Sequence, residues 1–150
     1  ETAAADLMQT ELGSPTENRS ETSYNEFRRD ALATERRTQQ HPEQDPRQSN
    51  LESTLAHREG PYVAATDYMK IVPDQVQRWM PGQYVTLGTD GYGRSDARDA
   101  LRRFFEVDER YIAVTALKAL ADEGQVDQKT VSSAIAKYGI DPDKPDPVTL

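Results

Sequence analysis

One short loop holds the residues of this sequence that are best placed to do chemistry. It is the run Thr89-Asp90-Gly91-Tyr92-Gly93-Arg94-Ser95-Asp96, which follows a short apolar segment and precedes a helical one. Two glycines and an arginine between a strand and a helix can hold a phosphate on backbone amides and on the N-terminus of the helix. A small α/β module that binds a phosphorylated ligand is therefore one hypothesis for this chain.

The same loop also has features that disfavour an anion site. The dinucleotide-binding fingerprint has a third glycine where the helix packs on the strand, and this sequence has Asp96 at that point. Asp90 and Asp96 would also repel an anion. We therefore rank a structural turn or a loop that contacts another domain above a phosphate site, which stays as the alternative.

The other candidate side chains lie in polar surroundings. His41 and His57 are the only histidines, and neither has a second histidine, a cysteine or a group of carboxylates at ligand spacing. Several arginines fall within 28–37, but Asp30 and Glu35 are interleaved with them, so a solvated, salt-bridged helix face is expected. The chain has no cysteine and so no thiolate ligand or nucleophile. We predict no catalytic, cofactor-binding or metal-binding residue.

The elements that must position the loop form a strand–helix–strand pattern. Residues 62–66 and 83–88 are short β-branched and aromatic runs, separated by one helix-length segment, 68–80. This spacing is typical of a parallel sheet. We expect Asp67 to cap the intervening helix, and Pro73 either to kink it or to begin a second short helix. The loop then leaves the carboxyl end of the second strand, where open α/β sheets bind ligands.

Helices are predicted on both sides of this unit in the sequence. Ser23, Asp108 and Asp127 stand where helix N-caps are expected, and Glu26 has capping-box spacing to Ser23. Glycines and prolines bound the segments. The predicted helices cover 3–12, 24–40, 50–58, 96–105, 109–122 and 128–138, with an irregular stretch at 41–49.

The apolar residues are unevenly distributed. Residues 1–60 hold eight large apolar side chains and residues 61–150 hold twenty-nine, so we expect the core mainly in the second part. We predict one domain with a polar N-terminal part (1–60), an α/β core (61–140) and a flexible tail (141–150).

The charge balance limits the classes of partner. The sequence has 18 basic and 26 acidic residues, a net charge of -8 that is spread along the chain. A dispersed negative charge disfavours binding to nucleic acid, which needs a basic face. No apolar run approaches the roughly 20 residues of a membrane span, and the first residues lack the layout of a signal peptide. We expect a cytoplasmic protein that binds neither nucleic acid nor membrane.

Three stretches of the sequence resemble one enzyme family. They are VAATDYMKIVPDQVQRWMP (63–81), YVTLGTDGYGRSDARDALRRFFEVD (84–108) and AIAKYGID (134–141). They are similar to the C-terminal domain of the homodimeric, thiamine-dependent decarboxylating component of the bacterial pyruvate dehydrogenase complex. The similarity extends back through SYNEFRRDALATER (23–36) to AAADLM (3–8). It implies a transketolase C-terminal-like α/β fold, with a mixed, mainly parallel small sheet and helices on both faces.

The resemblance also implies what the chain does. In that family the thiamine diphosphate, its magnesium ion and the main acid–base groups belong to the two preceding domains, so no catalytic residue is carried over. The implied reaction of the parent is decarboxylation of pyruvate and acetylation of a lipoyl group. The implied partners are the remaining domains, the homodimer mate and the dihydrolipoyl acetyltransferase, with the loop 89–96 as a contact surface. An acidic scaffold with no enzymatic role is a further alternative, and the oligomeric state stays open.

The sequence departs from the family pattern near its start. The strand that usually precedes the first helix is absent, and Asn18, Arg19 and Glu21 stand where a second strand, at 14–22, usually has apolar residues. The residues at 37–40 and 48–50 are likewise polar where members of the family have larger apolar side chains. Burying such side chains unpaired would cost roughly 2 to 7 kcal/mol each. We expect this part to face solvent or to have lost its strand, as in a resurfaced fragment or a divergent natural homologue.

Overall fold

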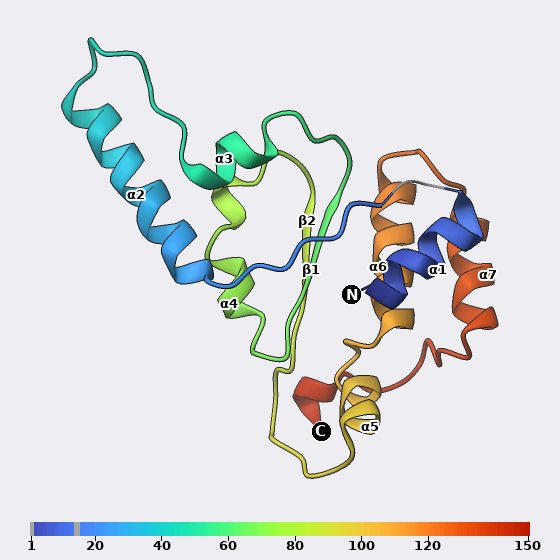
Figure 1. The fold of residues 1–150 in the computed structure, drawn as a ribbon. Helices are drawn as coiled ribbons and strands as arrows, with labels where there is room; N and C mark the ends of the chain where they lie inside the picture. Colours follow the sequence, from blue (N-terminus) through green and yellow to red (C-terminus); the bar gives the residue numbers. More distant parts are fainter. Residues whose placement is uncertain (1, 14–15) are drawn as a thin grey trace.

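The computed structural model describes residues 2–13 and 16–150. Within these ranges the order of elements is α1, α2, α3, β1, α4, η1, β2, α5, α6, α7 and η2, where η is a 3-10 helix (Figure 1). Their bounds are α1 Thr2–Leu12, α2 Tyr24–Gln40, α3 Asn50–Leu55, β1 Tyr62–Ala65, α4 Ile71–Asp74, η1 Gln77–Trp79, β2 Tyr84–Leu87, α5 Arg98–Phe104, α6 Glu109–Asp122, α7 Gln128–Lys137 and η2 Pro147–Thr149.

The two predicted strands pair in parallel. Tyr62 lies opposite Tyr84 and Ala65 lies opposite Leu87. The pairing continues past β1, where the Thr66 amide donates to the Leu87 carbonyl at 3.0 Å. The α/β class is therefore confirmed, and within the described ranges the sheet consists of these two strands.

Helices cover both faces of this small sheet. On one face α6 contacts β1 and β2, and α1 and α7 pack on α6. On the other face α4 lies next to α2, which in turn contacts α3. Figure 1 accordingly shows the two strands between α2, α3 and α4 on one side and α1, α6 and α7 on the other.

Each side has its own apolar cluster. The helical side buries residues from three helices, namely Met8, Ala113, Leu117, Ala121 and Val131. The opposite side buries Ala31, Leu51, Leu55, Val76 and Trp79. Three of these five residues precede residue 60, so the polar first part of the chain contributes most of the buried residues of this second cluster.

The segment between the strands differs from the main expectation. It forms two short helices, α4 and η1, and Pro73 is the third residue of α4 rather than the start of the second helix. Proline is tolerated there because the first turn of a helix does not use its amides. The prediction that Asp67 caps a helix is wrong, because α4 begins after Lys70 and has no side-chain cap. The carboxylate of Asp67 binds Arg102 at 2.9 Å instead.

Most other helix ends follow the sequence signals. Asp108 accepts hydrogen bonds from the amides of Arg110 and Tyr111, and Asp127 accepts one from the Lys129 amide, so both predicted caps are confirmed. Ser23 also accepts from the Glu26 amide, but the Glu26 carboxylate pairs with Arg29 rather than closing a capping box. The helices predicted over 50–58 and 96–105 are shorter, as α3 and α5 show.

The departures from the family pattern at 16–22 lie on the surface, whereas Ser49, within 48–50, is buried and donates a hydrogen bond to Glu52. Residues 16–22 form no strand and are exposed, while residues 14–15 of that segment lie outside the described residues. Glu17 forms ion pairs with Arg19 and Arg58, which hold the segment beside the chain that enters β1. Asn18, Arg19 and Glu21 therefore face solvent, as expected, and no strand contains them.

Candidate functional site

Hydrogen bonds attach the loop after β2 to the segment after β1. The Thr89 amide donates to the Tyr68 carbonyl at 2.9 Å, and the Thr89 hydroxyl donates to the Asp67 carbonyl at 3.0 Å. Asp90 accepts a hydrogen bond from the Lys70 amide at 2.9 Å. Asp90 therefore has a structural task, which is to fix the loop 89–96 against residues 67–70.

Two glycines allow the backbone to approach other segments closely. A Cβ atom on Gly88 would lie 2.7 Å from both the Lys70 amide nitrogen and the Tyr68 carbonyl oxygen. Gly91 has a φ of 106°, and a Cβ atom there would lie 2.9 Å from the Pro147 carbonyl oxygen. Packing of the loop against its neighbours thus accounts for both glycines.

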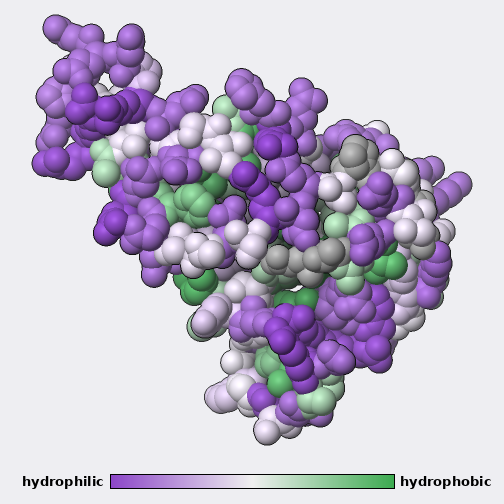
Figure 2. Space-filling model, viewed as in Figure 1, coloured by the Kyte–Doolittle hydropathy of each residue, from purple (hydrophilic) through white to green (hydrophobic). Residues whose placement is uncertain are grey.

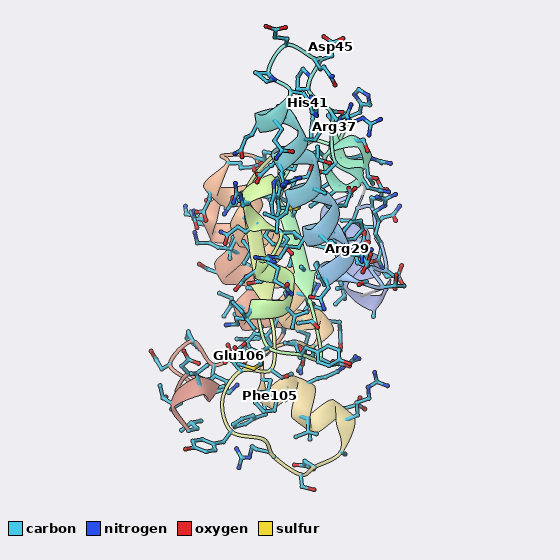
Figure 3. The ribbon with its side chains drawn as sticks, turned by 90° about the vertical axis from the view of Figure 1, so that its left-hand side faces the viewer. Arg29, Arg37, His41, Asp45, Phe105 and Glu106 are labelled. Carbon is cyan, nitrogen blue, oxygen red and sulfur yellow. The ribbon has the colours of Figure 1, made fainter. Side chains whose placement is uncertain are left out.

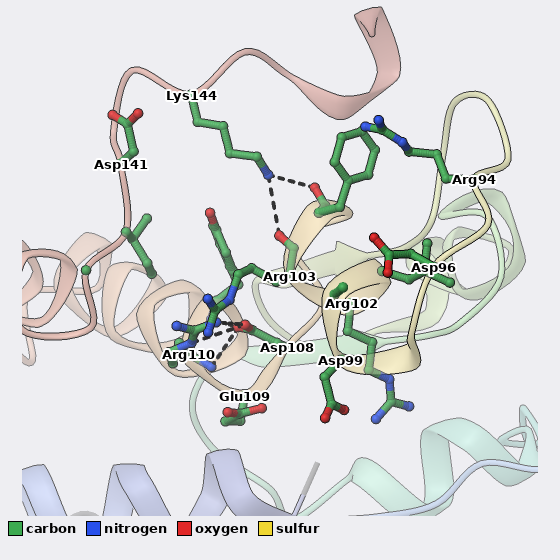
Figure 4. A pocket seen from close by; sticks show the side chains of 16 residues that line it. Arg94, Asp96, Asp99, Arg102, Arg103, Asp108, Glu109, Arg110, Asp141 and Lys144 are labelled. Carbon is green, nitrogen blue, oxygen red and sulfur yellow. Dashed lines mark hydrogen bonds and ion pairs between the residues drawn. The ribbon is translucent and has the colours of Figure 1, made fainter.

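Arg94 is directed toward α5 rather than toward the loop amides. Its guanidinium carbon lies 4.2 Å from the centre of the Phe104 ring, a distance typical of a cation–π contact (Figure 4). The residues of the loop from 91 to 96 are exposed. The structure thus places Gly91, Tyr92, Gly93, Arg94, Ser95 and Asp96 together on the surface, and of these Arg94 and Asp96 line a neighbouring pocket.

A pocket of about 940 Å³ lies beside this loop, between α5, the start of α6 and the segment after α7 (Figure 4). Its charges are balanced, because five basic and five acidic side chains line it. They are Arg94, Arg102, Arg103, Arg110 and Lys144, and Asp96, Asp99, Asp108, Glu109 and Asp141. An equal number of both signs gives no net positive potential for a phosphate.

Several of the basic groups in the pocket already hold structure together. Lys144 donates to the Phe104 carbonyl at 2.6 Å and to Glu106 at 2.9 Å, which fastens the C-terminal segment to α5. Arg110 pairs with Asp108, and this hydrogen bond raises the pKa of Arg110. The contacts of Lys144 were not predicted, because they join groups about 40 residues apart that only the tertiary fold brings together, whereas Arg110 and Asp108 are two residues apart.

Asp67 joins the end of β1 to α5. It accepts from Arg102 at 2.9 Å and from Arg98 at 3.4 Å. The hydrogen bond from Arg102 is the main cause that lowers the pKa of the Asp67 carboxyl, although burial opposes it. Since α5 begins at Arg98, this pairing sets where α5 stands relative to the loop 89–96.

His41, Arg29 and Arg37 lie away from this region. Figure 3 shows Arg29, Arg37 and His41 along α2 and at its end, while Phe105 and Glu106 lie at the opposite end of the molecule. Arg29 pairs with Glu26, and Arg37 donates to Gln44 at 2.9 Å, so a solvated polar face is what the structure has there.

The donor groups do not fit a magnesium diphosphate site. Among residues 2–13 and 16–150, no three His, Cys, Asp or Glu side chains come together in a group able to hold a metal ion. His41 and His57 are both exposed. We therefore derive no chemical step from thiamine diphosphate on this chain.

None of the helices in the described part combines the length and the hydropathy that crossing a membrane requires.

Comparisons of this chain with known proteins found one matching family and several relatives. The family model described as "Transketolase-like TK C-terminal domain" matches residues 2–108. The chain is 50% identical over 146 residues to the pyruvate dehydrogenase E1 component of Pseudomonas aeruginosa, which covers 97% of this chain and 17% of that protein. The corresponding protein of Cupriavidus necator is 43% identical over 99% of this chain and 16% of its own length. That of Escherichia coli K12 is 43% identical over 96% of this chain and 16% of its own.

The matches cover nearly all of this chain but only a small part of each relative. The chain spans about one sixth of the length of the curated relatives that it matches. The family model covers well over half of the 150 residues. The chain belongs to the transketolase-like C-terminal domain family.

Proposed function

We propose that this chain is the C-terminal domain of a pyruvate dehydrogenase E1 component and that it supplies contacts within that enzyme rather than catalytic groups. The observation that carries the proposal is the 50% identity to the Pseudomonas aeruginosa protein over 97% of the chain. The resemblance implies that the whole enzyme decarboxylates pyruvate with thiamine diphosphate and magnesium and acetylates a lipoyl group. This chemistry belongs to the larger enzyme, of which the chain is a minor part.

The geometry supports a contact role for the loop 89–96. The loop is exposed, yet its base is fixed by the hydrogen bonds of Thr89 and Asp90 to the segment after β1. A surface that is already ordered loses little conformational entropy when another surface covers it. Tyr92 at the tip is 83% exposed and offers a large amphipathic side chain to such a contact.

The same proposal extends to the partners. They are the remaining domains of the parent chain and the homodimer mate, with the dihydrolipoyl acetyltransferase as a further candidate, and the implied location is the cytoplasm. A phosphorylated ligand at the loop 89–96 receives less support, because the balanced charges of the neighbouring pocket give no attraction for an anion.

An exchange of domains tests this proposal. The region of the Pseudomonas aeruginosa enzyme that matches this chain is replaced by this chain, and pyruvate-dependent decarboxylation is measured. We expect the chimera to retain activity and the enzyme without the region to lose it. An assembled chimera without activity, or a deletion variant with full activity, would overturn the proposal.

A further inference from the structure

The large apolar side chains that stand out into solvent gather at one end of the sheet. Tyr68, Met69 and Ile71, on the segment after β1, are 72%, 56% and 63% exposed. Tyr92, on the loop after β2, is 83% exposed. Val148 and Leu150 in the C-terminal segment are 48% and 55% exposed, and these six complete the set found in the described part of the chain. We call these six residues the carboxyl-end patch.

The three segments of the carboxyl-end patch lie side by side. The Tyr68 carbonyl accepts from the Thr89 amide, which joins the first segment to the second. Gly91 stands against Pro147 and Val148, which joins the second to the third. Figure 2 shows pale and green surface at the lower end of the molecule, where Figure 1 places the loop after β2 and the C-terminus. The patch is thus formed by three parts of the sequence whose backbones lie against one another.

The fold of the chain does not require these side chains. The local backbone is held by hydrogen bonds of Thr89 and Asp90 and by the close approach at Gly88. Aromatic and methionine side chains are enriched in protein–protein interfaces, and a gathered apolar surface marks an interaction site more often than single exposed residues do. The carboxyl-end patch therefore has the composition of an interface that is uncovered in the isolated chain.

The charges around the patch suit a weakly charged partner. Asp67 is paired with Arg98 and Arg102, so its negative charge is compensated locally, and the Asp90 carboxylate accepts a hydrogen bond from the Lys70 amide. This differs from the chain as a whole, which carries a net charge of -8. Because two such chains repel one another over the rest of their surfaces, the charges favour another kind of surface over a second copy.

We propose that the carboxyl-end patch is the face against which the rest of the E1 chain packs. The occupant is then an apolar, weakly charged surface of the five-sixths of the enzyme that lies outside this chain, as the relatives' lengths indicate. Two buried tyrosines alone cover about 300 to 500 Å², a substantial share of an interdomain interface of roughly 600 to 1,500 Å². The inference rests on the proposed function and adds to it the surface through which the contacts are made.

The test compares a patch variant with a matched surface variant in the chimera described above. The patch variant carries Met69→Ser, Ile71→Ser and Tyr92→Ser. The control carries Ala33→Ser and Ala136→Ser, two exposed positions on α2 and α7. Limited proteolysis measures the rate of cleavage between the exchanged domain and the rest of the enzyme. We expect this rate to rise at least tenfold in the patch variant and to stay within about twofold in the control, because exposed surface substitutions have small effects.

Measurements on the 150-residue chain alone complete the test. We expect the patch variant and the unsubstituted chain to have the same thermal midpoint, and both to sediment as monomers. A loss of stability in the isolated patch variant would show that the side chains serve the fold, and a dimer that the substitutions abolish would assign the patch to a second copy. Either result would overturn the inference.

The two proposals fail in different ways. An active chimera in which the patch variant and the control are cleaved at the same rate contradicts the inference alone. A chimera whose domain is protected from cleavage through the patch but which has no activity contradicts the proposed function alone. An unsubstituted chimera that does not assemble contradicts both.

Discussion

The packing of α1 on α6 gives the sharpest stability prediction. Met8 on α1 is 4% exposed and belongs to the same cluster as Leu117 of α6 and Val131 of α7. The change Met8→Ala keeps a good helix former at the position, so it removes packing rather than helix propensity. Any loss of stability then reports directly on the contact between the first helix and the rest of the chain.

The expected magnitude follows from the burial of the side chain. Full burial of a methionine side chain contributes about 1.5 to 3 kcal/mol, and the cavity left in its place raises the total loss to about 2 to 5 kcal/mol. At about 2 to 4 °C per kcal/mol for a chain of this size, the thermal midpoint should fall by roughly 4 to 20 °C.

Urea unfolding followed by circular dichroism measures this loss. The control is Gln9→Ala, at the exposed position next to Met8 on the same helix, which should change the free energy of unfolding by no more than about 0.5 kcal/mol. A Met8→Ala variant as stable as the control would refute the packing of α1 on α6.

Three further substitutions test other parts of the structure. The pKa of Asp67 is lowered in the folded chain, so the stability that its pairing contributes is present above the unfolded pKa of about 3.9 and is lost as the pH falls through the folded pKa. Asp67→Asn should therefore flatten the decline of stability at acid pH. Urea midpoints that fall equally steeply with pH in both proteins would show that the pairing with Arg102 contributes nothing. Ser49 is buried and caps α3, so Ser49→Ala should cost about 0.5 to 2 kcal/mol in urea unfolding, whereas an unchanged midpoint would mean that the cap is not formed. Gly88→Ala should cost about 1 to 3 kcal/mol and shift the amide resonances near Tyr68, because the new Cβ would lie 2.7 Å from the Tyr68 carbonyl; unchanged spectra would mean that the two segments are not in contact.

Local signals predicted the regular elements well. Asp108 and Asp127 stand directly before amphipathic runs, and both form the caps that the sequence indicates. The two strands were predicted because β-branched and aromatic residues mark them, and the helix-length spacing between them indicated parallel pairing. The caps and the strands are thus marked by residues within a few positions of each feature, and the pairing of the strands by the spacing between them.

Long-range contacts account for what the sequence did not predict. Asp67 has the position of a helix cap, yet Arg102, 35 residues further on, takes its carboxylate. Tyr68, Met69 and Ile71 fall in the segment 68–80, which was predicted as a helix, so their exposure at the end of the sheet was not foreseen. The capping box of Ser49 and Glu52 did have a local signal, since Glu52 follows Ser49 at N3 spacing, but it was missed after the prolines of the preceding loop.

The candidate loop shows the limit of a motif without its surroundings. In the sequence, Gly91 and Arg94 are compatible with a phosphate loop as well as with a structural turn, and only the aspartates nearby favour the turn. In the structure Gly91 lies against Pro147 and the guanidinium of Arg94 lies over Phe104, which is the packing that a structural loop would have. Both neighbours become visible only when the C-terminal segment and α5 are placed beside the loop.

We infer that this domain works through its surface and leaves the cofactor chemistry to other parts of the enzyme. Calorimetric titration of the isolated chain with thiamine diphosphate, in the presence and absence of magnesium, is the decisive measurement. We expect no heat beyond dilution in either condition. Tight, magnesium-dependent binding to this chain alone would contradict it.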